Sequence, residues 1–182
     1  MKPKLMLVVC MLATALPGAA QTPPVLTEGQ VTEQTLVDAL TPSKTVRTRS
    51  LRVTRDDDAG GGAVTPAKPA SASLLITFET NSAALTSAAR RSLDVVRDAL
   101  ASDKLSPFRF AIEGHADPRG MPEANLKLSQ ARAESVRDYL VSTGKIDAAR
   151  LDAVGKGDRE LLNKANPIAA ENRRVTIVNL SK

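Results

Sequence analysis

Apolar and polar positions follow a regular pattern from about residue 73 to the end of the chain. Every second position from 74 to 78 is strongly apolar, which predicts a strand over 74–79 with one apolar face. A stripe of apolar residues at steps of four, three and four then predicts an amphipathic helix that starts near Thr86. The stripe consists of Ala89, Leu93, Val96 and Leu100.

The pattern repeats once more and then shortens. Alternation at Phe108, Phe110 and Ile112 predicts a second strand. A second helix follows and ends at Gly144, as glycine commonly ends helices. The residues that mark this helix are Leu128, Ser135, Val136, Tyr139 and Leu140. Segments 151–154 and 175–180 read as short strands. The order βαβαββ predicts an α/β (α+β) sandwich with a mixed four-stranded sheet and helices packed on one face.

The N-terminus has the pattern of an export signal. Two lysines precede an apolar run over 5–15, and small residues stand just before Gln21, which predicts a cleaved signal peptide. The apolar run is shorter than the roughly 20 residues that span a bilayer, so no transmembrane segment is expected after cleavage. The single cysteine, Cys10, lies inside the run, so neither a lipid anchor nor a disulfide is expected in the mature chain.

The segment between the signal and the periodic region is polar and irregular. A short helix over 32–41, capped by Thr32, is its one periodic element. The basic stretch 44–55 fits an edge strand or a disordered arm, and the Gly-, Pro- and Ala-rich linker 56–72 lacks the apolar residues that offset the entropy of ordering. The predicted organisation is a signal peptide over 1–20, a flexible N-terminal segment over 21–72 and one domain over 73–182.

Charge and composition narrow the class of partner. The chain has a formal net charge of +5, and loss of the two lysines of the signal would leave +3 (5 − 2). Aromatic residues make up only 2% of the chain, whereas nucleic-acid-binding proteins usually combine clustered basic residues with stacking aromatics. An exported, mildly basic protein is better matched to an anionic wall polymer than to nucleic acid.

Polar residues gather between the second strand and the second helix, over 113–120. Asn125 and Arg132 are seven residues apart, so both project from nearly the same face of the helix, and Asp117 lies just before the helix starts. A carboxylate and a guanidinium on either side of a groove recognise a zwitterion, because the first binds an ammonium and the second a carboxylate. The alternatives are that Asp117 pairs directly with Arg132 or that it only caps the helix.

Two enzymatic alternatives involve the same segment. Glu113, His115 and Asp117 would share one face of an extended chain and resemble metal ligands, although there is one histidine in the chain and no cysteine outside the signal to complete a set. A serine nucleophile would need the Gly-x-Ser-x-Gly turn, which the sequence lacks. We therefore expect no catalytic activity, metal or cofactor, and interpret His115 as a hydrogen-bonded turn residue that organises the loop.

The periodic region resembles the OmpA-like domain family, and especially its branch of peptidoglycan-associated lipoproteins. The resemblance extends over about residues 73–180 and follows motifs in the order of the family. These motifs are Phe78 to Ala83, Gly114 to Asp117 with Gly120, Asn125, Leu128-Ser129, Arg132-Ala133, Val136, Tyr139-Leu140, Gly144, Arg150-Leu151, Gly155 and Asn172 to Val175.

The resemblance implies a domain that holds the diaminopimelate residue of the peptidoglycan stem peptide, whose side-chain end carries an ammonium and a carboxylate. The family's aspartate and arginine that grip the ligand fall on Asp117 and Arg132. Its supporting asparagines fall on Asn81 and Asn125, and Arg173 is a further candidate. The neighbouring Arg174 is expected to brace the fold instead.

The expected function is therefore non-covalent binding of peptidoglycan in the periplasm, with a contribution to cell-envelope anchoring. The protein would be associated with the wall and peripheral to the outer membrane. The alternative is an interaction protein that uses the domain only for localisation and docks a second envelope protein through residues 26–56.

Overall fold

The computed structural model describes residues 25–27, 30–42, 69–79, 82–144 and 146–181. The predicted signal peptide, the basic stretch 44–55 and most of the linker lie outside these ranges. Within them, no helix combines the length and the apolar character needed to cross a bilayer.

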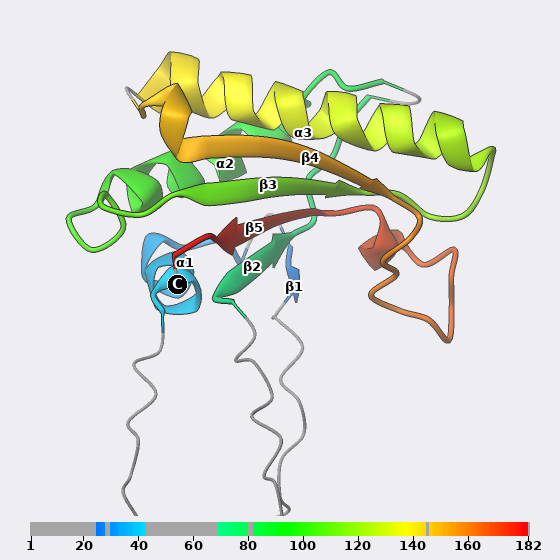
Figure 1. Cartoon of the computed structure of the whole chain (residues 1–182), viewed down its shortest axis with the longest axis horizontal. Helices are drawn as coiled ribbons and strands as arrows, with labels where there is room; N and C mark the ends of the chain where they lie inside the picture. The colour runs from blue at the N-terminus through cyan, green and yellow to red at the C-terminus, as the bar shows by residue number, and fades with distance from the viewer. Residues whose placement is uncertain (1–24, 28–29, 43–68, 80–81, 145, 182) are drawn as a thin grey trace, which may run out of the picture.

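The described strands form one mixed sheet in the order β1-β2-β5-β3-β4 (Figure 1). The pairs β1/β2 and β3/β4 are parallel, and β5 is antiparallel to both β2 and β3. The strands are β1 (Val25–Leu26), β2 (Ser71–Leu74), β3 (Phe110–His115), β4 (Leu151–Gly157) and β5 (Val175–Asn179). From β2 onward, the elements follow the predicted βαβαββ order, with the second helix between β3 and β4.

Three α-helices and two short 3-10 helices complete the described chain: α1 (Glu33–Leu40), α2 (Ser87–Ala101), α3 (Pro122–Gly144), η1 (Ala148–Arg150) and η2 (Ala170–Asn172). Helix α2 begins where the sequence predicts, because the Thr86 side chain accepts a hydrogen bond from the Ala89 amide at 3.1 Å. Helix α3 lies along β4 and β3, and α2 packs between α3 and α1 (Figure 1).

The core lies between the helices and one face of the sheet. Ala72, Ile177 and Ile112 stand side by side on β2, β5 and β3, and all three are fully buried. The four predicted stripe residues of α2 are fully buried as well. Burial of apolar surface is the main favourable term in folding, so this layer holds the sheet and helices together.

Two predictions about the N-terminal half of the chain were wrong. The sheet has five strands rather than four, because Val25–Leu26 adds an edge strand to β2. Part of the segment predicted to be flexible is also packed on the domain: α1 buries Leu36 and Leu40 completely, and the Leu40 carbonyl accepts a hydrogen bond from the Asn179 side chain at 2.8 Å. The helix was predicted correctly, but its apolar side faces the core.

The first predicted strand was also displaced. Strand β2 covers Ser71–Leu74, whereas the alternation predicted 74–79. Beyond Leu74 the chain leaves β5, because the ladder with β5 ends at the pair of Leu74 and Val175. Ile76 stays buried in the core and Phe78 makes only an isolated bridge to Leu85, so the alternation reflects burial without a continuous ladder.

Two glycines bring α3 unusually close to the sheet. Gly114 of β3 and Gly155 of β4 are neighbours in the parallel ladder. A β-carbon on Gly155 would lie 2.7 Å from the Gln130 amide nitrogen, and one on Gly114 would overlap the Ser129 carbonyl oxygen. The helix backbone therefore rests directly on the strands at this point, which we call the glycine seat.

Helix α3 also covers the outer edge of β4. The Gln130 side chain donates to the Ala153 carbonyl at 3.2 Å and accepts from the Gly155 amide. The Ser129 hydroxyl accepts from the Gly157 amide at 2.9 Å. Strand edges with free amides and carbonyls invite pairing with other chains, and these side chains satisfy them in place of a further strand.

Candidate functional site

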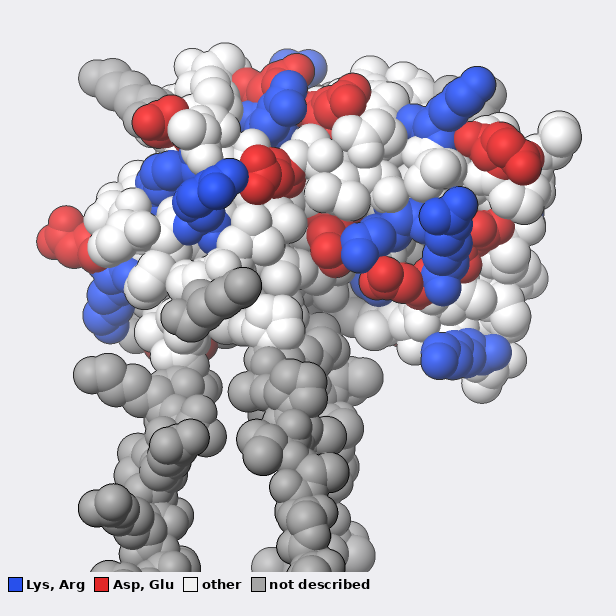
Figure 2. All heavy atoms as spheres, in the orientation of Figure 1, with Lys and Arg blue, Asp and Glu red and all other residues white. Residues whose placement is uncertain are grey.

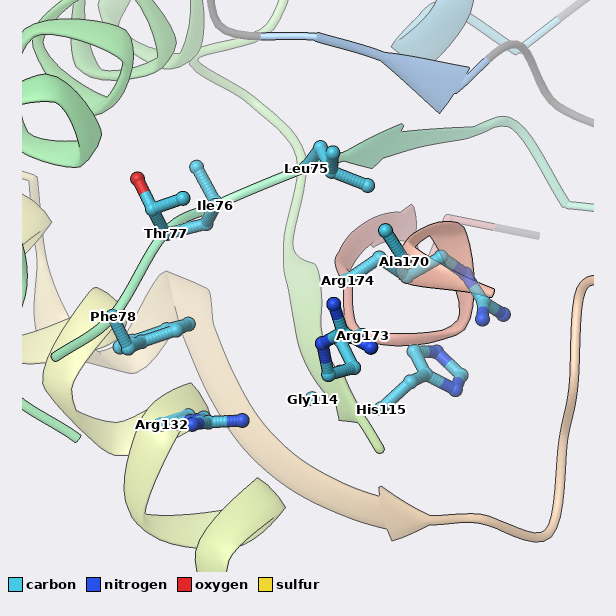
Figure 3. Close-up of a pocket in the computed structure, with 10 residues that line it drawn as sticks. All are labelled: Leu75, Ile76, Thr77, Phe78, Gly114, His115, Arg132, Ala170, Arg173 and Arg174. Carbon is cyan, nitrogen blue, oxygen red and sulfur yellow. The ribbon is translucent and has the colours of Figure 1, made fainter. Parts of the chain in front are cut away.

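The predicted site residues that the structure describes, Asp117, Asn125, Arg132 and Arg173, lie at the end of the sheet where β2, β3 and β4 finish and β5 begins. A hollow of about 280 Å³ opens there. Figure 3 shows Phe78 and Arg132 on one side of it and Arg173 and Arg174, from the chain between η2 and β5, on the other. The lining residues are Leu75, Ile76, Thr77, Phe78, Gly114, His115, Arg132, Ala170, Arg173 and Arg174.

Asp117 is buried beside the hollow and bound by two arginines. Its carboxylate accepts from Arg119, with a shortest distance of 2.7 Å, and from Arg173 at 2.8 Å. The Arg119 amide also donates to it at 3.1 Å. These bonds, led by that of the Arg119 side chain, lower the pKa of Asp117 to about 2, although burial acts in the opposite direction. The carboxylate is therefore ionised at any physiological pH.

Arg132 reaches the hollow from the second turn after Asn125 on α3. Its Nε donates to the Ser82 carbonyl at 3.1 Å, and its guanidinium carbon lies 4.8 Å from the centre of the Phe78 ring. Among the described residues no carboxylate pairs with Arg132, and no hydrogen bond is made by its terminal nitrogens. Burial and the nearby charge of Arg173 lower its pKa, and the charge of Asp117 partly opposes them. The guanidinium stays charged and is well placed for an anion.

Asn125 and Arg173 join the same cluster around Asp117. The buried Asn125 amide donates to the Asp117 carbonyl at 3.1 Å and to the Asp158 carboxylate at 3.3 Å, so it ties α3 to the ends of β3 and β4. Arg173 follows directly after η2 and binds the Asp117 carboxylate. Asn81 lies outside the described residues, so its predicted role stays a prediction.

The contacts of Asp117 differ from both alternatives, a direct pair with Arg132 and a cap of α3. In the described chain no bond links Asp117 to Arg132; the partners of Asp117 are Arg119 and Arg173. Asp117 does not cap α3 either, because its side chain accepts the amide of Arg119, ahead of the helix that starts at Pro122. The carboxylate and the guanidinium of Arg132 are thus separate groups near one hollow, as the zwitterion hypothesis requires.

Two residues of the site were missed in the sequence. Arg119 stands only two positions after Asp117, and spacing alone did not show that the loop folds its side chain back. Asn172 is fully buried, and its side chain makes five hydrogen bonds to backbone groups of residues 162–167. It holds the long loop before β5 and thereby positions Arg173. The asparagine of an Asn-Arg-Arg run was the one available signal.

His115 differs from its predicted role. It is the last residue of β3, it is 3% exposed, and neither ring nitrogen makes a hydrogen bond of normal geometry to the described residues. Its backbone amide donates to the Arg174 carbonyl at 2.9 Å. In the described chain the ring is therefore a packed group at a strand end and does not bond the loop. Burial and then the charge of Arg174 lower its pKa to about 4, while Glu160 opposes them more weakly.

Arg174 is buried against the same side of the hollow as His115 (Figure 3). It donates to the Glu160 carbonyl at 3.3 Å, and burial lowers its pKa. This contact ties β5 to the turn after β4, as the expected bracing role requires.

Glu113, His115 and Asp117, the residues of the metal alternative, have the following neighbours in the structure. Glu113 and His115 approach only to 4.0 Å, and Asp117 is engaged by arginines. Within the described ranges, no cluster of three or more His, Cys, Asp or Glu side chains is arranged to hold a metal ion. Lys156 instead binds Glu113 at 3.2 Å and Glu160 at 3.0 Å.

Charged side chains of both signs alternate on the face seen in Figure 2. Basic groups there stand next to acidic ones instead of merging into one continuous patch. The charges on this face therefore largely offset one another.

Comparison with known proteins agrees with the fold and the motifs. The sequence pattern of the OmpA family matches residues 77–174. The peptidoglycan-associated lipoprotein of Rhizobium meliloti is 34% identical over 125 residues, which cover 65% of this chain and 69% of that protein. The corresponding lipoprotein of Pseudomonas aeruginosa is 38% identical over 108 residues, which cover 55% of this chain and 58% of that protein.

Among solved structures, the OmpA-like domain of FopA1 from Francisella tularensis superimposes with a TM-score of 0.51 at 21% identity, covering 59% of this chain and 69% of that one. This similarity concerns the fold alone. The family pattern spans more than half of the chain and includes the Asp117 cluster and eight of the ten residues that line the hollow. The chain therefore belongs to the OmpA family.

Proposed function

We propose that the protein binds peptidoglycan non-covalently in the periplasm and so contributes to anchoring within the cell envelope. The observation that carries the proposal is Arg132, a partly buried guanidinium at the hollow with no carboxylate partner in the described chain. Relatives named as peptidoglycan-associated lipoproteins support the choice of polymer. The function is binding alone, and no step of it breaks a bond.

The recognised group is proposed to be the side-chain end of diaminopimelate. Its carboxylate would bind the free nitrogens of Arg132, in the bidentate geometry that guanidinium groups favour. Its ammonium would bind the carboxylate of Asp117, which is ionised down to about pH 2. Asn125 would hold the two groups in place, because it ties the Asp117 backbone to α3.

Sedimentation with purified sacculi tests the proposal. Arg132→Ala should weaken binding roughly ten- to a hundredfold, since charge-assisted hydrogen bonds contribute about 1.5 to 3 kcal/mol. Arg137→Ala is the matched control on the same helix, because Arg137 pairs with Asp138 at 2.8 Å and should leave binding unchanged. If Arg132→Ala binds sacculi like the parent while folding normally, the proposed groove is wrong.

The docking of a second envelope protein through residues 26–56 remains a separate prediction. Helix α1, within that range, turns Leu36 and Leu40 into the core, so these apolar side chains are not available to a partner. Residues 43–56 lie outside the described chain. Deletion of 43–56, with the helix retained, tests that role, and urea unfolding of the variant reports whether the domain keeps its stability.

A further inference from the structure

The Asp117 carboxylate has no free acceptor position for a ligand. Oδ1 accepts from the amide and from Nε of Arg119, both at 3.1 Å. Oδ2 accepts from the terminal nitrogen of Arg119 at 2.7 Å and from Arg173 at 2.8 Å. A carboxylate offers about four lone-pair positions, so the chain's own donors fill them. An ammonium can reach Asp117 only if one of these donors leaves.

The two arginines differ in how firmly they are held. The Arg119 side chain is 61% exposed, and within the described chain its only hydrogen-bond partner is Asp117. Arg173 is 41% exposed, also donates to the Ile168 carbonyl at 3.4 Å, and follows the fully buried Asn172. When the Arg119 side chain leaves, it breaks bonds to Asp117 alone, whereas Arg173 would also lose the Ile168 carbonyl, so Arg119 is the donor that a ligand displaces.

The loop can stay in place when the Arg119 side chain leaves. The backbone amide of Arg119 has its own bond to Asp117, and Gly120 adopts a φ of +99°, which glycine tolerates at no steric cost. Departure of the guanidinium therefore requires rotation of side-chain bonds and no refolding of the backbone.

We infer that Arg119 is an intramolecular competitor at the ammonium side of the groove, and that a ligand binds by displacing its guanidinium from Asp117. This inference rests on the proposed peptidoglycan function and adds a determinant of specificity to it. A ligand ammonium replaces one cation by another at the buried carboxylate, so the charge around Asp117 is unchanged. A ligand without that ammonium cannot replace Arg119 and loses this half of the site.

Calorimetric titration with two stem peptides tests the inference. The first ends in meso-diaminopimelate with its side-chain ammonium free, and the second is the same peptide with that nitrogen acetylated. Arg119→Gln should bind the free-ammonium peptide more tightly than the parent, by roughly two- to fivefold or more, because an ion pair of which only the arginine is exposed no longer has to be broken. Its affinity for the acetylated peptide should not increase.

Arg109→Gln is the matched control. Arg109 is also 61% exposed and pairs with Asp152 at 3.1 Å, but it lies at the opposite end of β3. It removes the same charge and should leave both affinities unchanged. Equal or weaker binding of the free-ammonium peptide by Arg119→Gln would overturn the inference while parental binding upholds the proposed function. Failure of the parent to bind either the peptides or sacculi would overturn both.

Discussion

Helices α2 and α3 pack on the same side of the sheet by different means. Helix α2 meets the core through fully buried apolar side chains such as Leu93 and Val96. The first half of α3 meets the sheet through the glycine seat and through the buried polar residues Asn125 and Ser129. Apolar side chains contribute stability without fixing direction, whereas polar and backbone contacts fix position. The contrast separates the part that holds the domain together from the part that positions the site.

The boundary between the two kinds of packing runs through α3 itself. Its second half returns to apolar contacts, with Val136 and Leu140 fully buried. The Tyr139 hydroxyl donates to Asp94 of α2 at 3.0 Å and so joins the two helices. The second half of α3 therefore stabilises the domain together with α2, whereas the first half positions the site together with the strand ends.

The largest expected effect comes from a substitution on the apolar face of α2. Leu93→Ala should lower the free energy of unfolding by about 2 to 5 kcal/mol, because it leaves a cavity in a fully buried position. The affinity of the folded molecules for sacculi should stay the same. Urea unfolding and sedimentation at low temperature measure the two quantities, and a loss of affinity in fully folded protein would contradict the separation.

A substitution at the glycine seat should cost less stability than Leu93→Ala, but it should also weaken binding. Gly155→Ala should cost about 2 kcal/mol, because the added β-carbon meets the backbone of Gln130 and pushes α3 from the sheet. Binding should fall severalfold although Gly155 does not line the hollow. Gly144→Ala, whose β-carbon would meet the Arg97 and Ile146 side chains at the far end of α3, is the control, which should also lose stability but keep normal binding. Equal affinities in the two variants would show that the seat does not position the site.

The loss of folding stability at acid pH should come from the polar region, through His115. The pKa of His115 is lowered from 6.5 to about 4 in the folded state, so the unfolded chain binds the extra proton first as the pH falls. Stability should decrease between about pH 6.5 and pH 4, by about 2 kcal/mol from pH 7 to pH 5. His115→Gln should flatten this part of the profile in urea unfolding, while a profile like that of the parent would exclude His115 as its source.

The smallest expected effect lies at the covered edge of β4. Gln130→Met should cost about 1 kcal/mol, because the Ala153 carbonyl and the Gly155 amide lose their partner. Gln130→Glu keeps the acceptor for Gly155 but places a carboxylate against the Ala153 carbonyl and the Glu134 carboxylate, so it should cost at least as much. Thermal unfolding ranks the variants, and light scattering reports any pairing of the freed edge; equal stability of all three proteins would show that the edge needs no cover.

The sequence predicted elements well where one face is apolar and neighbours along the chain decide the outcome. Helix α2 begins at its predicted cap because Thr86 and the stripe act locally. The packing of α1 on the domain was not predictable, because its partners are distant in sequence, as the bond from Asn179 to Leu40 illustrates. The strand over 74–79 was misplaced because alternation reports burial and not the partner strand.

For the candidate site, the sequence indicated which residues lie together, but not which hydrogen bonds they make. Spacing and family resemblance brought Asp117, Asn125 and Arg132 to one end of the sheet. The contact of the Arg119 side chain with Asp117 depends on the path of a tight loop, and hydrophobic periodicity does not predict such a path. The function of these residues in binding remains the subject of the experiments above.

The glycine seat has a consequence for how such a domain can change over generations. The contact between Gly114 and the Ser129 carbonyl lies three residues before Asp117 on one side and three before Arg132 on the other. Two backbones in contact leave no side chain whose replacement would alter their separation. Changes in the apolar core should therefore alter the spacing of the two charged groups less than the loss of either glycine would.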